Sequence, residues 1–227
     1  DWHAGPYRMI NYHEDLEAGI SGLRIAYSRS LGYATVDDHV SEVVEKSVHH
    51  FEELGAEIFE VDPGIEDPIE PMITLWSVGL ALLIENTPAH KRGLMDKPIL
   101  ELAEQGRTVG SIGVRRAEQA REALAVKINL FMEDYDLLIT PQLPLTAFKA
   151  GNEVPPERGM IRWWEWSPFT YPFNLTQHPA ATVPCGLAND NLPVCLQIIA
   201  PRYSEHKLLR VCRAFENLQP FVMPKSA

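Results

Sequence analysis

Residues 23–61 read LRIAYSRSLGYATVDDHVSEVVEKSVHHFEELGAEIFEV, and this stretch decides the fold class. It begins with a short β-prone run, and residues 57–61 form a second one. Between them Asp37-Asp38 opens a helix, because acidic side chains favour the positive end of the helix dipole, and Gly55 ends it. The apolar residues of that helix fall at helical spacing on one face: Val40, Val43, Val44, Phe51 and Leu54. A strand, a helix and a strand with short connections predict a βαβ unit with parallel strands.

The rest of the chain continues to mix helices and strands. Apolar spacing and proline or glycine boundaries predict helices at residues 68–86, 97–105, 113–134 and 204–217. Strands are predicted at residues 136–140, 181–183 and 194–199, with a hairpin-like turn at Asn189-Asp190-Asn191. The last two helices are expected to pack through Ala117, Leu124, Ile128 and Phe131, and through Leu208, Leu209, Cys212 and Phe215. The sequence therefore predicts an α/β protein with a mixed β-sheet and flanking helices.

The chain is expected to have two parts of unequal regularity. Residues 1–22 are predicted to be an irregular lead-in, and residues 23–227 to be one continuous portion of a domain. Within that portion, residues 141–178 are rich in proline and aromatic residues and show no periodicity. A long coil in a compact domain is usually functional or disordered, and its aromatic residues argue against disorder. We therefore expect a functional loop at residues 141–178.

Composition and charge argue against several classes of function. With 45% apolar and 22% charged residues the chain is typical of a globular protein. A formal charge of −11 argues against nucleic-acid binding, because phosphate contacts need clustered Lys and Arg. The apolar stretch Ile73–Ile84 is shorter than the ~20 residues that span a bilayer, so no membrane association is expected. Three cysteines without CxxC spacing favour a reducing, cytoplasmic location. Because the chain starts at Asp1 instead of Met, we expect a fragment.

No cluster of residues predicts catalysis or metal binding by itself. Gly110-Ser111-Ile112-Gly113 is the nearest approach to a nucleophile turn, but no strand precedes it, and the chain has no adjacent pair of serines. His49-His50 and the following Glu52-Glu53 favour a solvated helix over a metal site, because neighbouring residues on a helix point in different directions. Cys185 is expected to be an inert buried thiol rather than a nucleophile. Residues 28–32 hold one glycine, so a phosphate loop is not supported.

Several short segments carry a resemblance to a known family. They are GLRIAY (22–27), LGAEI (54–58), DYDLLITP (134–141), FTYPFNLTQHPAATVPCG (169–186) and LPVCLQII (192–199). In this order they resemble the C-terminal portion of the amidase-signature enzymes, a family that includes the A subunit of glutamyl-tRNA amidotransferases. They are spread from residue 22 to residue 199, and a helix with Glu205, Leu208, Leu209 and Glu216 extends the resemblance to residue 216. The resemblance implies the amidase-signature fold, of which this chain is the C-terminal portion.

The resemblance also implies an activity, namely hydrolysis or transfer of amide nitrogen. The family uses a nucleophilic Ser, a second Ser in a cis peptide and a Lys as base, with backbone N–H groups that hold the oxyanion. These groups lie in a segment N-terminal to everything matched here, so no catalytic residue is assigned to this chain. Ser111 and Lys127 are not substitutes for them. The chemistry needs side chains and water alone, so no cofactor and no metal are expected.

A substrate-binding role is implied for part of residues 163–174. The segment that starts at Phe169 runs near the acyl-binding cleft in the family, which makes Phe169, Thr170 and Asn174 candidates. The nearby Trp163, Trp164 and Trp166 are candidates for apolar walls. Two alternatives stay open. Thr170 and Asn174 could serve only to satisfy buried backbone groups, and the tryptophans could belong to the core.

The chain departs from the family pattern at several positions. Ser167-Pro168 stands where the A subunit of the amidotransferases tends to have Asp-Ile, so the carboxylate that would meet a glutamine ammonium is missing. Gln142 replaces the commoner Thr, Gln177-His178 replaces Gly-x, and Cys195 replaces Gly. The Ser167-Pro168 departure argues against a glutaminase role, and the tryptophan-rich loop fits a more apolar or aromatic amide.

Two readings of function follow. In the first, the chain is a fragment of an amidase that acts on a small-molecule amide, inactive alone and completed by the missing N-terminal half. In the second, it is a non-catalytic pseudo-amidase or binding domain; the A subunit of a glutamine-dependent amidotransferase is a further alternative. A lone C-terminal portion would expose apolar strand edges and faces, so we expect it to be oligomeric, for instance a homodimer, or held by the missing half.

Overall fold

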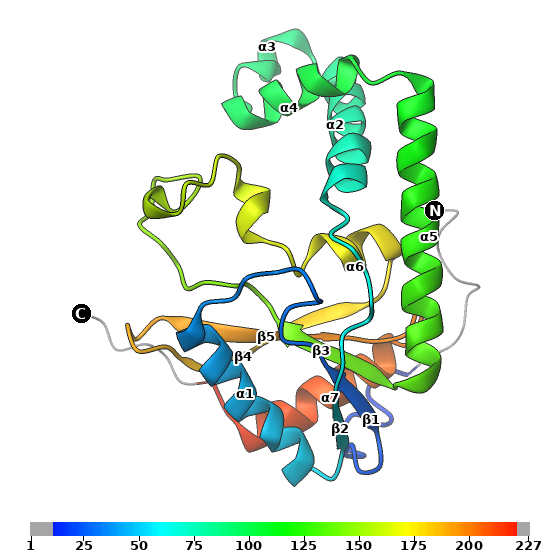
Figure 1. Ribbon diagram of the computed structural model, residues 1–227, viewed down its shortest axis with the longest axis vertical. Coiled ribbons are helices and arrows are strands. Elements are labelled where there is room, and N and C mark those ends of the chain that lie inside the picture. The colour runs from blue at the N-terminus through cyan, green and yellow to red at the C-terminus, as the bar shows by residue number, and fades with distance from the viewer. Residues whose placement is uncertain (1–10, 222–227) are drawn as a thin grey trace. The chain divides into compact units, whose positions relative to one another are not determined.

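The computed structural model describes residues 11–221, which form two compact units (Figure 1). Unit 1 comprises residues 1–66 and 127–227, of which 11–66 and 127–221 are described, and unit 2 comprises residues 67–126. Of the expected lead-in at residues 1–22, the first ten residues lie outside the described part. Residues 11–22 form turns that end at Gly22, whose N–H donates to the Gly55 carbonyl across 2.8 Å.

Unit 1 contains a five-stranded mixed sheet in the order β2-β1-β3-β5-β4. The strands are β1 (Arg24–Tyr27), β2 (Glu57–Glu60), β3 (Leu137–Pro141), β4 (Ala180–Leu187) and β5 (Pro193–Ile199). β1 pairs in parallel with β2 and β3, whereas β5 runs antiparallel to β3 and β4. The expected βαβ unit, hairpin and mixed sheet are therefore confirmed.

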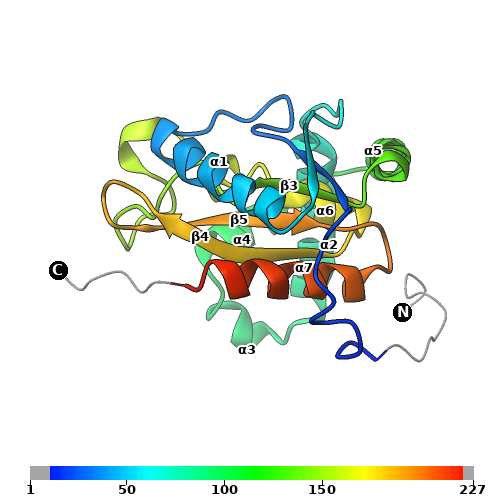
Figure 2. The same cartoon turned by 90° about the horizontal axis from the view of Figure 1, so that it is seen from below.

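Two helices cover one face of this sheet. α1 (Asp38–Glu53) and α7 (Glu205–Leu218) lie below the strands in Figure 1, and Figure 2, which views the molecule from below, draws α1 and α7 with β4 and β5 between them in projection. Phe51 of α1 stacks on Phe215 of α7, with ring centroids 4.9 Å apart. Both rings are buried with the inward side chains of the strands, such as Ile139 and Ile198. The predicted inward faces are largely correct. Leu209 is the exception: it is 42% exposed because it is rotated by about 100° from Leu208.

Asp136 fixes the start of β3 to its neighbours. Its two carboxylate oxygens accept hydrogen bonds from the Lys207 Nζ on α7 at 2.6 Å and from the Arg24 N–H at 3.0 Å. Burial alone would raise the pKa of Asp136, but these two hydrogen bonds and the positive charges of Lys207 and Arg210 together outweigh it, and the pKa is lowered. The carboxylate therefore joins strand β1, strand β3 and helix α7 at one corner.

The other face of the sheet carries residues 141–178, which we call the aromatic segment. It is more regular than the sequence predicts, because it contains the 3₁₀ turns η1 (Pro156–Arg158) and η2 (Trp163–Trp166) and the helix α6 (Tyr171–Thr176). α6 lies above the strands in Figure 1, opposite α1 and α7. Between these short helical turns the aromatic segment is irregular, and its buried side chains Phe169, Tyr171 and Phe173 anchor it.

Unit 2 is helical. It contains α2 (Ile69–Asn86), the unpredicted short helix α3 (Ala89–Arg92), α4 (Lys97–Arg107) and residues 111–126 of α5 (Ser111–Asp134), whose last residues belong to unit 1. α2 is longer than the apolar stretch Ile73–Ile84 suggests. By length and composition it could cross a membrane, a weak indication that core helices also give. One face of α2 buries Met72, Leu80 and Ile84.

Gly106 sets the distance between α2 and α4. A Cβ atom at this position would lie 2.1 Å from the Ser77 carbonyl oxygen, far inside van der Waals contact. The helices can therefore cross this closely only because residue 106 has no side chain.

We predict that Gly106→Ala destabilises unit 2 by about 1–3 kcal/mol or more, because the added methyl group forces α2 and α4 apart. Gly79→Ala is the matched control, since nothing lies within 4 Å of a Cβ there. It should be neutral or stabilise α2 by up to about 1 kcal/mol through higher helix propensity. Urea denaturation followed by far-ultraviolet circular dichroism measures both. Equal stability of the two variants would show that the α2–α4 crossing is not tight.

Candidate functional site

A buried polar bridge joins the sheet to the aromatic segment. Thr140 at the end of β3 lies opposite Gln197 of β5, and both side chains are almost fully buried. The Gln197 Nε2 donates to the Thr140 Oγ1 at 3.3 Å and to the Phe169 carbonyl at 2.8 Å. One amide group therefore holds the chain just before α6 against the centre of the sheet, in a place where an unpaired polar group would be costly.

Further hydrogen bonds hold the aromatic segment to the start of α1. Arg158 in η1 makes a two-pronged ion pair with Asp37, at 2.7 and 2.5 Å. The Tyr33 hydroxyl donates to the Pro168 carbonyl at 2.7 Å. The Asp37 N–H donates to the Pro144 carbonyl at 2.8 Å. The loop after β1 and the aromatic segment are thus fastened to each other at three points, which gives the segment a defined position.

The three predicted tryptophans form one cluster in η2. Trp163 contacts Trp164 and Trp166 edge-on, with ring centroids 5.7 and 6.5 Å apart. All three side chains are half-buried. The Trp166 Nε1 donates to the Glu153 carbonyl at 3.0 Å, and its ring meets that of Phe148 edge-on at 5.8 Å. Trp166 is therefore fixed in orientation at both ends of its ring.

Trp166 lines a cavity of about 390 Å³, which we call the aromatic cavity. Its walls come from the start of α1, the chain after β3, η2 and β5, and none of the lining residues is charged. They are Val40, Gln142, Leu143, Leu145, Thr146, Ala147, Phe148, Trp166, Pro193, Val194 and Cys195. A cavity of this size and apolar character, with a few polar groups, is typical of a small-molecule site.

The other predicted site residues lie away from this cavity's walls. Phe169 is fully buried, so its side chain is part of the core. The Thr170 Oγ1 donates to the Ser167 carbonyl at 3.0 Å, which favours the alternative that Thr170 satisfies a local backbone group. Asn174 is exposed on α6. Gln142, Phe148 and Cys195 were missed as lining residues, although the departures from the family pattern at Gln142 and Cys195 were a usable signal.

Comparison with known proteins identifies the family. The sequence matches the family described as Amidase over residues 6–209, which is most of the chain. The chain belongs to the amidase family. The five-stranded sheet and flanking helices are those of the amidase-signature fold, as expected.

Three similar proteins illustrate the range of this amidase family. The chain is 33% identical over 223 residues to an acylamidase of Rhodococcus erythropolis, covering 96% of this chain and 46% of that protein. It is 27% identical to the A subunit of the glutamyl-tRNA(Gln) amidotransferase of Thermotoga maritima, over 94% of this chain and 49% of that protein. The structure of 6-aminohexanoate cyclic dimer hydrolase superposes with a TM-score of 0.83 at 19% identity, over 97% of this chain and 50% of that one. The chain thus spans about half the length of these relatives.

Ser167, at the position where the A subunit of an amidotransferase tends to have Asp, is buried. Its hydroxyl donates to the Trp164 carbonyl at 3.2 Å within the tryptophan turn. It is therefore committed to the local fold and carries no charge that could pair with an ammonium group.

Gln177, one of the residues that depart from the family's sequence pattern, forms a tight turn. It adopts a left-handed conformation, with φ 60° and ψ 32°, at the end of α6. A side chain there costs of order 1 kcal/mol. Its Oε1 accepts a hydrogen bond from the Arg202 Nη2 at 3.2 Å. This contact ties the turn at the end of α6 to the chain before α7.

His178 follows as a buried, neutral histidine. Its Nδ1 lies 2.8 Å from the Thr176 Oγ1, and its side chain is 5% exposed. Burial, assisted by the positive charge of Arg202, lowers the pKa of His178 to about 4. A histidine that stays neutral near pH 7 at the junction of α6 and β4 makes this junction sensitive to acid.

Cys185, His49 and His50 show no arrangement that would serve catalysis or metal binding. Burial raises the pKa of the Cys185 thiol to about 12, which makes its thiolate rare. His49 and His50 each face their own glutamate three residues on, Glu52 and Glu53, rather than a common point. Among residues 11–221 no group of three or more potential ligands could hold a metal ion.

We predict that Gln197→Leu lowers the stability of unit 1 by about 1–3 kcal/mol, because the buried Phe169 carbonyl loses its donor. Hydrogen exchange should accelerate most in residues 142–176, which the polar bridge holds against the sheet. Gln119→Leu on the exposed side of α5 is the control and should change neither quantity. If exchange in the aromatic segment were unchanged, the polar bridge would not position it.

We predict an acid-sensitive stability term from His178. Its pKa is about 4 in the folded state against 6.5 unfolded, so the unfolded chain binds the proton first as the pH falls. The stabilisation is complete above pH 6.5 and declines by roughly 3 kcal/mol between pH 6.5 and 4. His178→Gln should flatten this part of the stability–pH curve, whereas His206→Gln at an exposed site should not. Denaturation midpoints measured from pH 4 to 8 give the comparison, and parallel curves for all three proteins would contradict the assignment.

Proposed function

We propose that this chain is the C-terminal portion of an amidase that hydrolyses carboxylic amides with an apolar or aromatic substituent. It supplies the sheet scaffold and one wall of the substrate pocket, while the nucleophilic serine, the cis serine and the lysine come from the remaining half of the same protein. The observation that carries the proposal is the aromatic cavity, in which an amidase-family scaffold presents Trp166 and Phe148 and no charged side chain.

The proposed chemistry divides between the two halves. In the half outside this chain, the serine oxygen attacks the amide carbonyl, the amine leaves with a proton, and water then releases the acid from the acyl-serine. The contribution of this chain is binding and orientation. Trp166, fixed by its bond to the Glu153 carbonyl, offers a flat apolar surface to an aryl or alkyl group of the amide.

A glutamine-dependent amidotransferase is less well supported. The relatives include the A subunits of such amidotransferases, so the family alone does not decide between the two. The discriminating feature is Ser167, which is neutral and buried where those subunits tend to have a carboxylate. A zwitterionic amino acid would meet no charge along the walls of the aromatic cavity, whereas the apolar substituent of an uncharged amide would incur no desolvation cost there.

The proposed partner of this chain is the other half of its own protein, and a homodimer stays a prediction. β4 is the outermost strand of the described sheet on its side, but it is a poor template for pairing with a second copy. Pro184 lacks an N–H, and a bulge follows it between Pro184 and Gly186. Such features usually protect a sheet edge from pairing.

We predict that the complete protein, produced from the longer reading frame, hydrolyses acyl anilides and that Trp166→Ala lowers kcat/KM for them by about 10–100-fold. The loss reflects an aromatic wall worth a few kcal/mol. Trp164→Ala is the matched control, because it lies in the same 3₁₀ turn but is not a wall of the aromatic cavity. It should change kcat/KM by less than about threefold.

Three results would argue against the proposal. Preferred hydrolysis of glutamine would favour the glutamine-dependent amidotransferase. Absence of turnover with a folded complete protein would favour a binding domain without catalysis. Equal losses in the two tryptophan variants would remove the aromatic cavity from the reaction.

A further inference from the structure

Asp37 stands directly before α1, at the position where an aspartate normally caps a helix. A capping side chain accepts a hydrogen bond from a backbone N–H of the first helical turn. The Asp37 side chain makes no such bond, although its backbone is extended, with φ −65° and ψ 139°. Its two carboxylate oxygens instead accept hydrogen bonds from Arg158, at 2.7 and 2.5 Å. The contact with Arg158, 121 residues away in sequence, thus takes the place of the helix cap.

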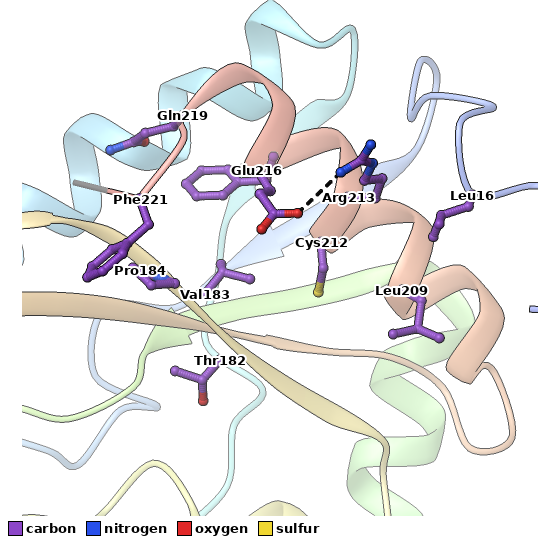
Figure 3. Close-up of a pocket in the computed structure, with 11 residues that line it drawn as sticks. Leu16, Thr182, Val183, Pro184, Leu209, Cys212, Arg213, Glu216, Gln219 and Phe221 are labelled. Carbon is purple, nitrogen blue, oxygen red and sulfur yellow. Dashed lines mark ion pairs between the residues drawn. The ribbon is translucent and has the colours of Figure 1, made fainter. Parts of the chain in front are cut away.

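This ion pair joins two different walls of the aromatic cavity. Val40, in the first turn of α1, forms one wall, whereas Trp166 belongs to the aromatic segment on the other. The pair between Arg213 and Glu216, the dashed line in Figure 3, joins residues that are only three positions apart on α7. Unlike that local pair, the contact of Asp37 with Arg158 sets the position of one cavity wall against the other.

A short stiff segment connects Arg158 to Trp166. It comprises residues 153–158, and we call it the proline strut. At its first residue, the Glu153 carbonyl accepts the hydrogen bond of the Trp166 Nε1 at 3.0 Å. Pro155, which is buried, and Pro156 follow, and their rings restrict the backbone. At the other end, the Arg158 N–H donates to the Pro155 carbonyl at 3.2 Å. A displacement of Arg158 therefore reaches the carbonyl that orients the indole ring.

The ion pair is exposed enough to open. The Arg158 side chain is 39% exposed and that of Asp37 is 13% exposed. Ion pairs near the surface are weak and are screened by salt. The His39 Nε2 lies 3.9 Å from the Asp37 Oδ2, beyond hydrogen-bond distance, so the carboxylate is held by Arg158. On release, Asp37 can cap α1, and the regained cap offsets part of the lost ion pair.

We propose that Asp37 and Arg158 are positioning residues for Trp166 and thereby determine which amide substituents the aromatic cavity accepts. While the pair is formed, the proline strut fixes the indole ring, and the cavity fits a compact aryl group. When the pair breaks, the indole ring loses its fixed orientation, so the cavity admits a bulkier group and binds a compact one less tightly. The inference rests on the proposed function, because the aromatic cavity has to hold the substituent of the amide.

The first test needs no turnover. It follows hydrogen exchange of the Trp166 indole N–H by NMR in the complete protein with isotope-labelled tryptophan, and Trp166→Phe identifies the signal. We expect Arg158→Gln to accelerate this exchange about tenfold, because the Glu153 carbonyl is no longer held in place. Asp37→Asn should do the same, and since asparagine also caps helices, the start of α1 is preserved.

Arg213→Gln is the matched control. It removes the same charge from an ion pair of similar exposure, with the Arg213 side chain 41% exposed, on the opposite face of the sheet (Figure 3). It should change the exchange of the Trp166 indole N–H by less than about twofold. The double variant Asp37→Asn/Arg158→Gln should exchange no faster than either single variant, because both changes break one contact.

The second test compares hydrolysis of acetanilide and 4′-phenylacetanilide, which differ by one ring on the aryl group, by the complete protein. Arg158→Gln should raise KM for acetanilide about 5–10-fold and change kcat by less than about twofold, because the reacting groups lie in the other half. The kcat/KM for 4′-phenylacetanilide relative to acetanilide should rise about tenfold. Arg158→Lys keeps the charge without the two-pronged geometry, so its values should lie between those of Arg158→Gln and the unmodified protein.

Unchanged indole exchange in Arg158→Gln would overturn the inference, and so would an equal acceleration in Arg213→Gln. Additive effects of the Asp37 and Arg158 variants, or a fall in kcat at constant KM, would also contradict it. Absence of turnover with both anilides would contradict the proposed function, whereas the exchange measurement would still confirm or overturn the positioning of Trp166.

Discussion

The amide group of Gln197 is the interaction on which the architecture of unit 1 depends. Gln197 lies within β5, and its Nε2 donates hydrogen bonds to both the Thr140 hydroxyl and the Phe169 carbonyl. Without it, the chain that leads into α6 would have an unpaired carbonyl against the sheet. With it, the chain between η2 and α6 is held at a fixed distance from the strands. The tryptophan turn η2, which ends just before Phe169, is positioned by the same contact.

Much of the fold could be predicted from local patterns. The spacing of Val40, Val44 and Phe51 predicts α1 and its buried face, and the apolar run at residues 137–139 predicts β3. α6 could not be found in this way. It has six residues with a proline in its first turn, and its end depends on Gln177 adopting a conformation that glycine normally supplies. Its stability comes from packing and from the polar bridge, neither of which is local in sequence.

The site was harder to predict than the fold for the same reason. The aromatic cavity combines residue 40, residues 142–148, residue 166 and residues 193–195, which come together only through the strand order β3-β5-β4. Tryptophan is common in ligand sites, so its residue type alone made Trp166 a candidate from sequence. Phe169 has the same aromatic character but points into the core. Which of two neighbouring aromatics faces a cavity is set by the backbone of a 3₁₀ turn that the sequence pattern does not reveal.

Two of the departures from the family pattern lie on the walls of the aromatic cavity. Gln142 and Cys195, where amidases commonly have Thr and Gly, both line the aromatic cavity. Ser167, where the amidotransferases tend to have Asp, directly follows Trp166. Gln142 is also tied to β4, because the Thr182 Oγ1 donates to its Oε1 at 2.5 Å. Two of the four departures, Gln142 and Cys195, are 53 positions apart in sequence and yet line one cavity without a charge on its walls, whereas Gln177-His178 lies at the junction of α6 and β4.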